Sequence, residues 1–156
     1  MLRTIVAIDP GKTGGIAAWP EGSTFPIAFG MPETDGDLIA ELRALKSASS
    51  VEPVAFLEQV TGFRPGRRQP GSHMFTFGDN YGFLRATVQT LGFRLELVRP
   101  QLWQKALCLG TSTGLEPRAW KNKLKTKAQQ LYPNLEVTLK TADALLILDF
   151  ARRAPL

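Results

Sequence analysis

The segment TIVAIDPGKTGGIA, residues 4–17, places one carboxylate between two apolar runs. Residues 4–9 are mostly β-branched and apolar, they end at Asp9, and a Pro-Gly pair follows at once. A second apolar run begins after the glycine pair 14–15, so the segment is typical of a β-hairpin whose first strand ends in an acid. The apolar flanks would bury Asp9, and an isolated buried carboxylate is costly. A metal ion or a metal-bound phosphate is the natural partner of such an acid.

The apolar pattern along the rest of the chain predicts an α/β fold. An antiparallel opening is followed by strands that alternate with helices, which indicates a mixed five-stranded sheet flanked by helices, with right-handed crossovers to its parallel strands. The first helix is expected to have its N-cap near Asp35 or Asp37. The expected strands are residues 4–9, 14–19, 24–29, 54–60 and 93–98, and the expected helices are residues 37–45, 74–91, 100–107, 118–131 and 142–153.

Length and composition limit the possible classes of protein. A chain of 156 residues fits a single domain, residues 1–156, with a core of its own. No apolar run approaches the roughly 20 residues of a membrane span, and the N-terminus lacks the layout of a signal peptide, so we expect a cytoplasmic, nucleoid-associated protein. One cysteine, Cys108, and one histidine, His73, make a zinc site improbable. Any metal would be held by carboxylates, which favours Mg²⁺, with Mn²⁺ as the alternative.

The charge distribution favours a nucleic-acid partner over an ordinary basic surface. Lysine and arginine number 19 against 14 acids, a net charge of +5. The basic residues are clustered, and aromatic residues lie between the clusters, which is more typical of a nucleic-acid surface than of scattered solubility charges. The clusters are Arg64, Arg67 and Arg68; Arg118, Lys121, Lys123, Lys125 and Lys127; and Arg152 with Arg153.

Three carboxylates stand where apolar segments end or begin. Asp9 and Glu58 end two expected core strands, and Asp143 opens the last expected helix. Taken singly they have ordinary explanations: a turn cap, a solvated strand end and an acid favoured by the helix dipole. In a parallel α/β sheet, however, ligands gather at the carboxyl ends of strands. Three acids converging there could bind two Mg²⁺ ions, which activate water and stabilise the leaving oxygen in phosphodiester cleavage.

The chain also resembles a known family in several segments that follow the family's order. The segments AIDPGKTGGIA (7–17), FLEQV (56–60), VRPQLWQK (98–105) and ADALLI (142–147) look like successive motifs of RuvC-type Holliday junction resolvases, in the RNase H-like superfamily. The stretch PGSHMFTFGDNYG (70–82) is similar to phage, bacterial and chloroplast relatives. The resemblance implies an RNase H-like fold and a homodimeric, Mg²⁺-dependent endonuclease. Such an enzyme would cut four-way DNA junctions symmetrically in recombination and repair, leaving 5′-phosphate and 3′-hydroxyl ends.

The resemblance also implies residue roles. Asp9, Glu58 and Asp143 would hold the metal. Lys121 would lie near the scissile phosphate, with Lys123 as the second choice. The helix at 74–91 is the candidate dimer surface. Phosphate contacts give salt-dependent affinity, and aromatic rings stack on unpaired bases, so we expect a DNA-binding set. Its members are Lys12, Arg64, Arg67, Arg68, Lys105 and Lys123 for phosphates, and Phe75 and Phe77 for bases, although one of these two rings could instead pack in the core.

The sequence departs from the family pattern at one place, and two alternatives follow. About one turn before the last aspartate, where the family has a fourth acid or a histidine, the chain has Lys140 and Thr141. Asp149 lies off the face of Asp143 and is a poor substitute. The first alternative is therefore a catalytically weakened junction-binding protein. The second is a nucleotide phosphotransferase, because DPGKTGG resembles a phosphate loop of the actin and sugar-kinase superfamily. Those proteins need two such domains, for which 156 residues are too few.

A viral source would place the protein in the host cytoplasm.

Overall fold

A mixed five-stranded sheet forms the centre of the molecule. The computed structural model describes residues 3–60 and 71–155. The strands lie in the order β3-β2-β1-β4-β5, with β1 antiparallel to β2, β2 antiparallel to β3, and β1, β4 and β5 parallel. The predicted sheet is thus confirmed. The strands are β1 (Ile5–Asp9), β2 (Gly15–Trp19), β3 (Ile27–Gly30), β4 (Val54–Glu58) and β5 (Arg94–Val98).

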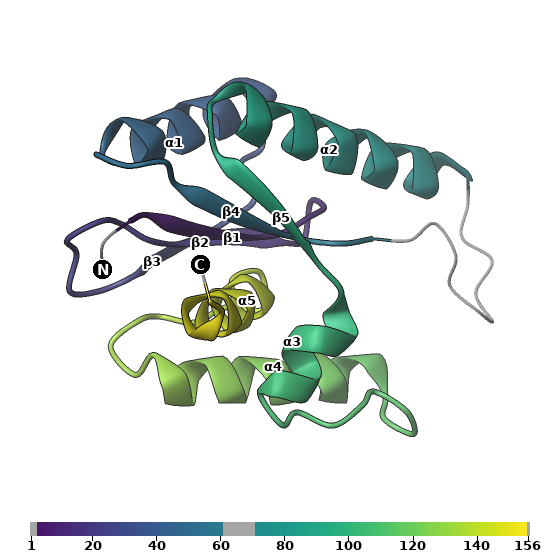
Figure 1. Cartoon of the computed structure of the whole chain (residues 1–156). Coiled ribbons are helices and arrows are strands. Elements are labelled where there is room, and N and C mark those ends of the chain that lie inside the picture. The colour runs from purple at the N-terminus through teal and green to yellow at the C-terminus, as the bar shows by residue number, and fades with distance from the viewer. Residues whose placement is uncertain (1–2, 61–70, 156) are drawn as a thin grey trace.

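Helices cover both faces of the sheet (Figure 1). Helices α1 (Asp35–Ser47) and α2 (Gly71–Thr90) lie on one face. Helix α5 (Ala142–Arg153) lies on the other, and α3 (Pro100–Ala106) and α4 (Pro117–Leu131) lie beyond it. Helix α5 is therefore enclosed between the sheet and α4, which explains why it is apolar on nearly every side.

The alternation of side chains along the strands divides the core in two. Ile5 and Ala7 of β1 face α5, whereas Val6 and Ile8 face α1 and α2. On β4, Phe56 belongs to the α5 side in the same way. Because strand side chains repeat every second residue, Asp9 and Glu58 continue the two series that face α5. This parity directs both acids towards the helix that contains Asp143.

The starts of β3 and α1 differ from the sequence expectation. The strand expected at residues 24–29 begins only at Ile27, because Pro26 has no N–H for the sheet and the Ser23 hydroxyl donates to the Phe25 carbonyl at 2.7 Å. The N-cap of α1 is Thr34, not Asp35 or Asp37: its hydroxyl oxygen accepts a hydrogen bond from the Asp37 N–H at 3.1 Å.

Helix α2 begins earlier than expected, at Gly71 rather than residue 74. Its first residues are exposed, so they have no apolar periodicity from which a helix could be predicted. The segment between β4 and α2 that contains Arg64, Arg67 and Arg68 lies outside the described residues. Within the part of the chain that the structure describes, no helix is both long and apolar enough to cross a membrane.

Candidate active site

Asp9 and Glu58 lie on neighbouring strands at the same end of the sheet. The parallel register pairs Ile8 of β1 with Leu57 of β4, so the next residue on each strand is one of the two acids. Both strands are otherwise buried apolar segments, and each acid is half-buried. The strand ends thus bring two carboxylates together in a place with little access to water.

Helix α5 contains the third acid, Asp143. It lies in the first turn of the helix, which packs on β1 and β2, and it is only 5% exposed. Burial raises the pKa of Asp9 well above its ordinary value, and the charges of Asp143 and then Glu58 raise it further. The three carboxylates therefore act on one another electrostatically.

Lys121 supplies the positive charge among these acids. Trp120, Leu124 and Ala128 bury one face of α4, and Lys121 at the edge of that face forms an ion pair with Asp143 through Nζ and Oδ2. Burial alone would lower the pKa of Lys121, but the charge of Asp143 and the hydrogen bond to it outweigh burial, and the pKa is raised.

Lys123, the second choice for this role, points elsewhere. Its ammonium group lies over the Trp120 ring, 5.7 Å from the ring centroid. The structure therefore brings Lys121, rather than Lys123, to the acids.

Trp103 contacts the site in a way that the sequence analysis missed. Trp103 is only 1% exposed and belongs to the core cluster that includes α5. In addition, the indole N–H donates a hydrogen bond to Glu58 Oε2 at 2.9 Å. The sequence contains no signal for this contact, because the contact depends on the sheet register that pairs Val98 with Glu58 and on the start of α3 at Pro100.

Helix α2 holds the turn that follows Asp9. The Gly11 N–H donates to Asn80 Oδ1 at 2.8 Å, and Gly11 has a φ of +99°, which favours glycine. The Phe77 ring lies so close that a Cβ at position 11 would be 2.9 Å from it. Phe77 is therefore half-buried against the turn, whereas Phe75 is 77% exposed. No sequence pattern predicted the hydrogen bond between Gly11 and Asn80, which lie 69 positions apart in the chain.

Lys140 lies beside the strands rather than among the acids. The backbone before α5 approaches β2 so closely that a Cβ at Gly15 would be 2.4 Å from the Lys140 carbonyl oxygen. Its side chain approaches Gly30, where an added Cβ would be 3.1 Å from Lys140 Cδ, and the ion pairs found among the described residues do not include Lys140. Asp149 pairs with Arg153 at 2.6 Å, one turn further along α5. Neither residue supplies a fourth ligand beside Asp143.

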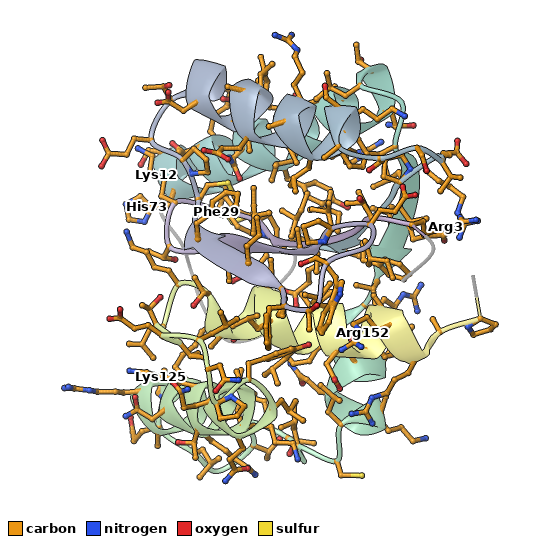
Figure 2. All side chains as sticks on the ribbon, turned by 90° about the vertical axis from the view of Figure 1, so that its left-hand side faces the viewer. Arg3, Lys12, Phe29, His73, Lys125 and Arg152 are labelled. Carbon is orange, nitrogen blue, oxygen red and sulfur yellow. The ribbon has the colours of Figure 1, made fainter. Side chains whose placement is uncertain are left out.

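The expected DNA-binding residues are only partly described. Arg64, Arg67 and Arg68 lie outside the described residues. Lys12, Lys105 and Lys123 are exposed, on the turn after β1, on α3 and on α4. The two arginines of the last basic cluster make contacts within the protein. Arg152 Cζ lies over the Trp19 ring, 3.6 Å from the ring centroid, and Arg153 forms an ion pair with Asp149. Figure 2 shows Lys12 and His73 at one edge of the molecule and Arg3 at the opposite edge.

The donor chemistry of the site fits a hard divalent cation. Carboxylate oxygens are the ligands that Mg²⁺ and Mn²⁺ prefer. Asp143 Oδ1 is buried and accepts no hydrogen bond from the described residues, so it is available to a ligand. Among residues 3–60 and 71–155, no three His, Cys, Asp or Glu side chains are grouped closely enough to hold a metal as they stand. Binding would have to draw the carboxylates together.

Comparison with known proteins places the fold. No protein-family model and no curated protein sequence matches this chain. A structure of Thermus thermophilus RuvC in complex with a Holliday junction substrate has a TM-score of 0.60 at 15% identity, over 96% of this chain and 95% of that chain. A second structure of Thermus thermophilus RuvC has a TM-score of 0.53 at 15% identity, with the same coverage. The likeness establishes the RNase H-like α/β fold of RuvC for this chain.

Proposed function

We propose that the chain is a metal-dependent endodeoxyribonuclease that resolves four-way DNA junctions, and that residues 1–156 act as one nuclease domain. The observation that supports this most directly is the meeting of Asp9, Glu58 and Asp143 at one end of a RuvC-like sheet. The fold alone is compatible with many functions, and it is these residues that point to phosphodiester hydrolysis. The sequence motifs favour the phage, bacterial and chloroplast-like branch of the resolvases.

Asp9, Glu58 and Asp143 would hold Mg²⁺, or Mn²⁺ in its place. The bound cation would activate a water molecule and stabilise the leaving oxygen of the phosphodiester. Asp143 would contribute Oδ1, the buried oxygen that accepts no hydrogen bond from the described residues. The low exposure of the site strengthens these charge interactions, because little water screens them.

Lys121 would then act on the DNA. Its ammonium group is held at the site by Asp143, and it is close enough to Asp9 and Glu58 for their charges to raise its pKa. It therefore remains protonated at neutral pH and can stabilise negative charge that develops on the scissile phosphate.

The exposed basic residues would bind the DNA backbone, and Phe75 would stack on bases left unpaired at the junction centre. Lys12, Lys105 and Lys123 would supply phosphate contacts. Arg64, Arg67 and Arg68 would do the same, and they lie outside the described residues. Two such domains, paired through α2 as a homodimer, would present two sites to one junction and so cut two strands. The homodimer would act on DNA of the nucleoid, or on viral DNA in a host cytoplasm.

The proposal is tested with a synthetic four-way junction whose strands are labelled one at a time. With Mg²⁺ or Mn²⁺, we expect paired nicks at symmetric positions, and no cutting of a linear duplex with the same arm sequences. Chelation should abolish the cutting. Intact junctions across both metals, or equal cutting of junction and duplex, would contradict the proposal.

A second candidate is a junction-binding protein with a weakened site. It is favoured by Lys140 at the place of the fourth acid and by the ammonium group of Lys121, which already neutralises Asp143. This candidate predicts tight, salt-sensitive binding of the junction with no cleavage in either metal. A gel-shift assay run beside the cleavage assay separates the two candidates.

A further inference from the structure

We propose that Trp103 is a positioning residue for Glu58: its indole N–H holds Oε2 and so limits the orientations that the carboxylate can take when it binds metal. The inference rests on the proposed function, because it assumes that Glu58 is a metal ligand. It assigns a role in the reaction to α3, an element that contains none of the three acids.

The contact is well suited to orientation. Trp103 Nε1 lies 2.9 Å from Glu58 Oε2, and the residue is 1% exposed, so the indole cannot be replaced by water without opening the core. An indole N–H donates and cannot accept, so its preferred partner is an acceptor such as a carboxylate oxygen. The terminal torsion of a glutamate is broad, and one hydrogen bond to a fixed donor restricts it.

The chain path explains why the donor is rigid. Val98 ends β5 opposite Glu58, and α3 begins at Pro100, whose fixed φ suits the first position of a helix. Trp103 follows within one turn of that start. Its ring packs in the core cluster that includes residues of α4 and α5, namely Leu124, Leu145 and Leu148. The donor is thus held by packing on the same core that positions Asp143.

A hydrogen-bonding partner behind a metal ligand orients the ligand, and its loss weakens metal binding by about 10- to 100-fold. The same loss should have little effect on DNA affinity, because Trp103 is buried and cannot touch DNA in this fold. The proposal therefore predicts a change in metal affinity that is separate from any change in junction binding.

The test is Trp103→Phe, which keeps an aromatic ring and removes the donor. We expect Mn²⁺ affinity, measured by calorimetry, to fall about 10- to 100-fold. Junction affinity in Ca²⁺ should stay within about twofold, and the unfolding transition in chelator should remain cooperative. The matched control is Trp19→Phe, which removes a 2.9 Å indole hydrogen bond to the Ser23 carbonyl, and it should leave Mn²⁺ affinity unchanged.

A double-mutant cycle with Glu58→Gln distinguishes positioning from packing. If Trp103 acts through Glu58, Trp103→Phe causes no further loss of Mn²⁺ affinity in the Glu58→Gln background. If the Phe variant does not fold, benzothienylalanine at position 103 keeps the bicyclic shape and lacks the N–H.

The outcomes separate this inference from the proposed function. Wild-type Mn²⁺ affinity in the Trp103 variants, with the wild-type protein binding Mn²⁺ and cutting junctions, overturns the positioning role alone. A wild-type protein that neither binds Mn²⁺ nor cuts overturns both.

Discussion

Asp9 is the residue whose environment opposes its own charge most strongly. Its burial and the neighbouring charges of Asp143 and Glu58 raise its pKa, and Lys121 only partly compensates. A raised pKa means that the folded chain binds a proton that the unfolded chain releases. Without metal, stability should therefore fall as the pH rises from the ordinary aspartate pKa of about 3.9 through the raised pKa of Asp9.

Asp9→Asn should remove this penalty. In chelator at pH 7 we expect the variant to be more stable than the wild type by about 0.5–2 kcal/mol, with a flatter dependence of stability on pH. Urea denaturation across a pH series measures both effects. Asp79→Asn, the same change at an exposed residue of α2, is the control and should stay within about 0.5 kcal/mol of the wild type. Equal pH profiles for Asp9→Asn and the wild type would contradict the electrostatic account.

Lys121 should matter for stability as well as for cleavage. Lys121→Met leaves the buried Oδ2 of Asp143 without its cation, so we expect a loss of about 1–2 kcal/mol in chelator, at the lower end because the lysine side chain is 47% exposed. Lys123→Met on the same helix should cost less than about 0.5 kcal/mol. Denaturation with and without Mg²⁺ measures this, and equal effects of the two substitutions would contradict the pairing.

At the scale of single residues, the sequence predicted those site residues that end or begin an apolar run. Asp9, Glu58 and Asp143 stand at such places, whereas Lys121 was predicted only through the family resemblance. The charges of Asp143, Glu58 and Lys121 all act on Asp9 in the structure. Trp103 and Asn80 were missed as contributors because their partners are remote in the chain, and their contacts depend on how helices dock.

At the scale of helices and strands, the packing of α5 on β2 depends on Gly15 of β2, which has no side chain. A Cβ at Gly15 would lie 2.4 Å from the Lys140 carbonyl oxygen and 2.8 Å from that of Phe29, and both atoms are backbone. Gly15→Ala should therefore displace the turn before α5, and with it Asp143. We expect a loss of about 1–3 kcal/mol in the free energy of unfolding and a lower cleavage rate.

Gly82→Ala on α2 is the matched control for this substitution. A Cβ there meets nothing within 4 Å, and alanine is the better helix former, so stability should rise by about 0.5–1 kcal/mol. Thermal unfolding of the two variants makes the comparison. A Gly15→Ala protein as stable as the wild type would show that the close approach does not determine the position of α5.

Elements with a regular apolar pattern were predictable, and those without one were not. The final helix was expected at residues 142–153 and is found there, because its apolar residues are continuous. The start of α2 was missed because residues 71–76 are exposed, and β3 was placed too early because its pattern includes Pro26.

At the scale of the whole molecule, we expect basic residues at opposite edges to differ in their contribution to DNA binding. Lys12 lies on the turn next to Asp9, at the opposite edge from Arg3 (Figure 2). We expect Lys12→Ala, in an Asp9→Asn background that cannot cut, to weaken junction binding and to reduce the slope of log K against log salt by about 1. Arg3→Ala should change neither quantity. Fluorescence anisotropy at several salt concentrations measures both, and equal slopes for the two variants would contradict a DNA face at Lys12.

The mixed five-stranded sheet was the part of the global fold that the sequence could anticipate. Antiparallel opening strands and alternating later elements predicted it, whereas the strand order and the strand parity that directs two acids towards α5 were found in the structure. The pairing partner of each helix required the folded chain, because an apolar helix face does not specify which surface it will cover.

The cleavage rate of the acid variants tests the central claim most directly. Under single-turnover conditions with Mg²⁺ and a four-way junction, Asp9→Asn, Glu58→Gln and Asp143→Asn should each cut at least about 100-fold more slowly than the wild type, with Asp79→Asn unaffected. Each variant should still bind the junction. Folded Asp9→Asn and Asp143→Asn proteins that cut the junction at the wild-type rate would contradict the assignment of the active site.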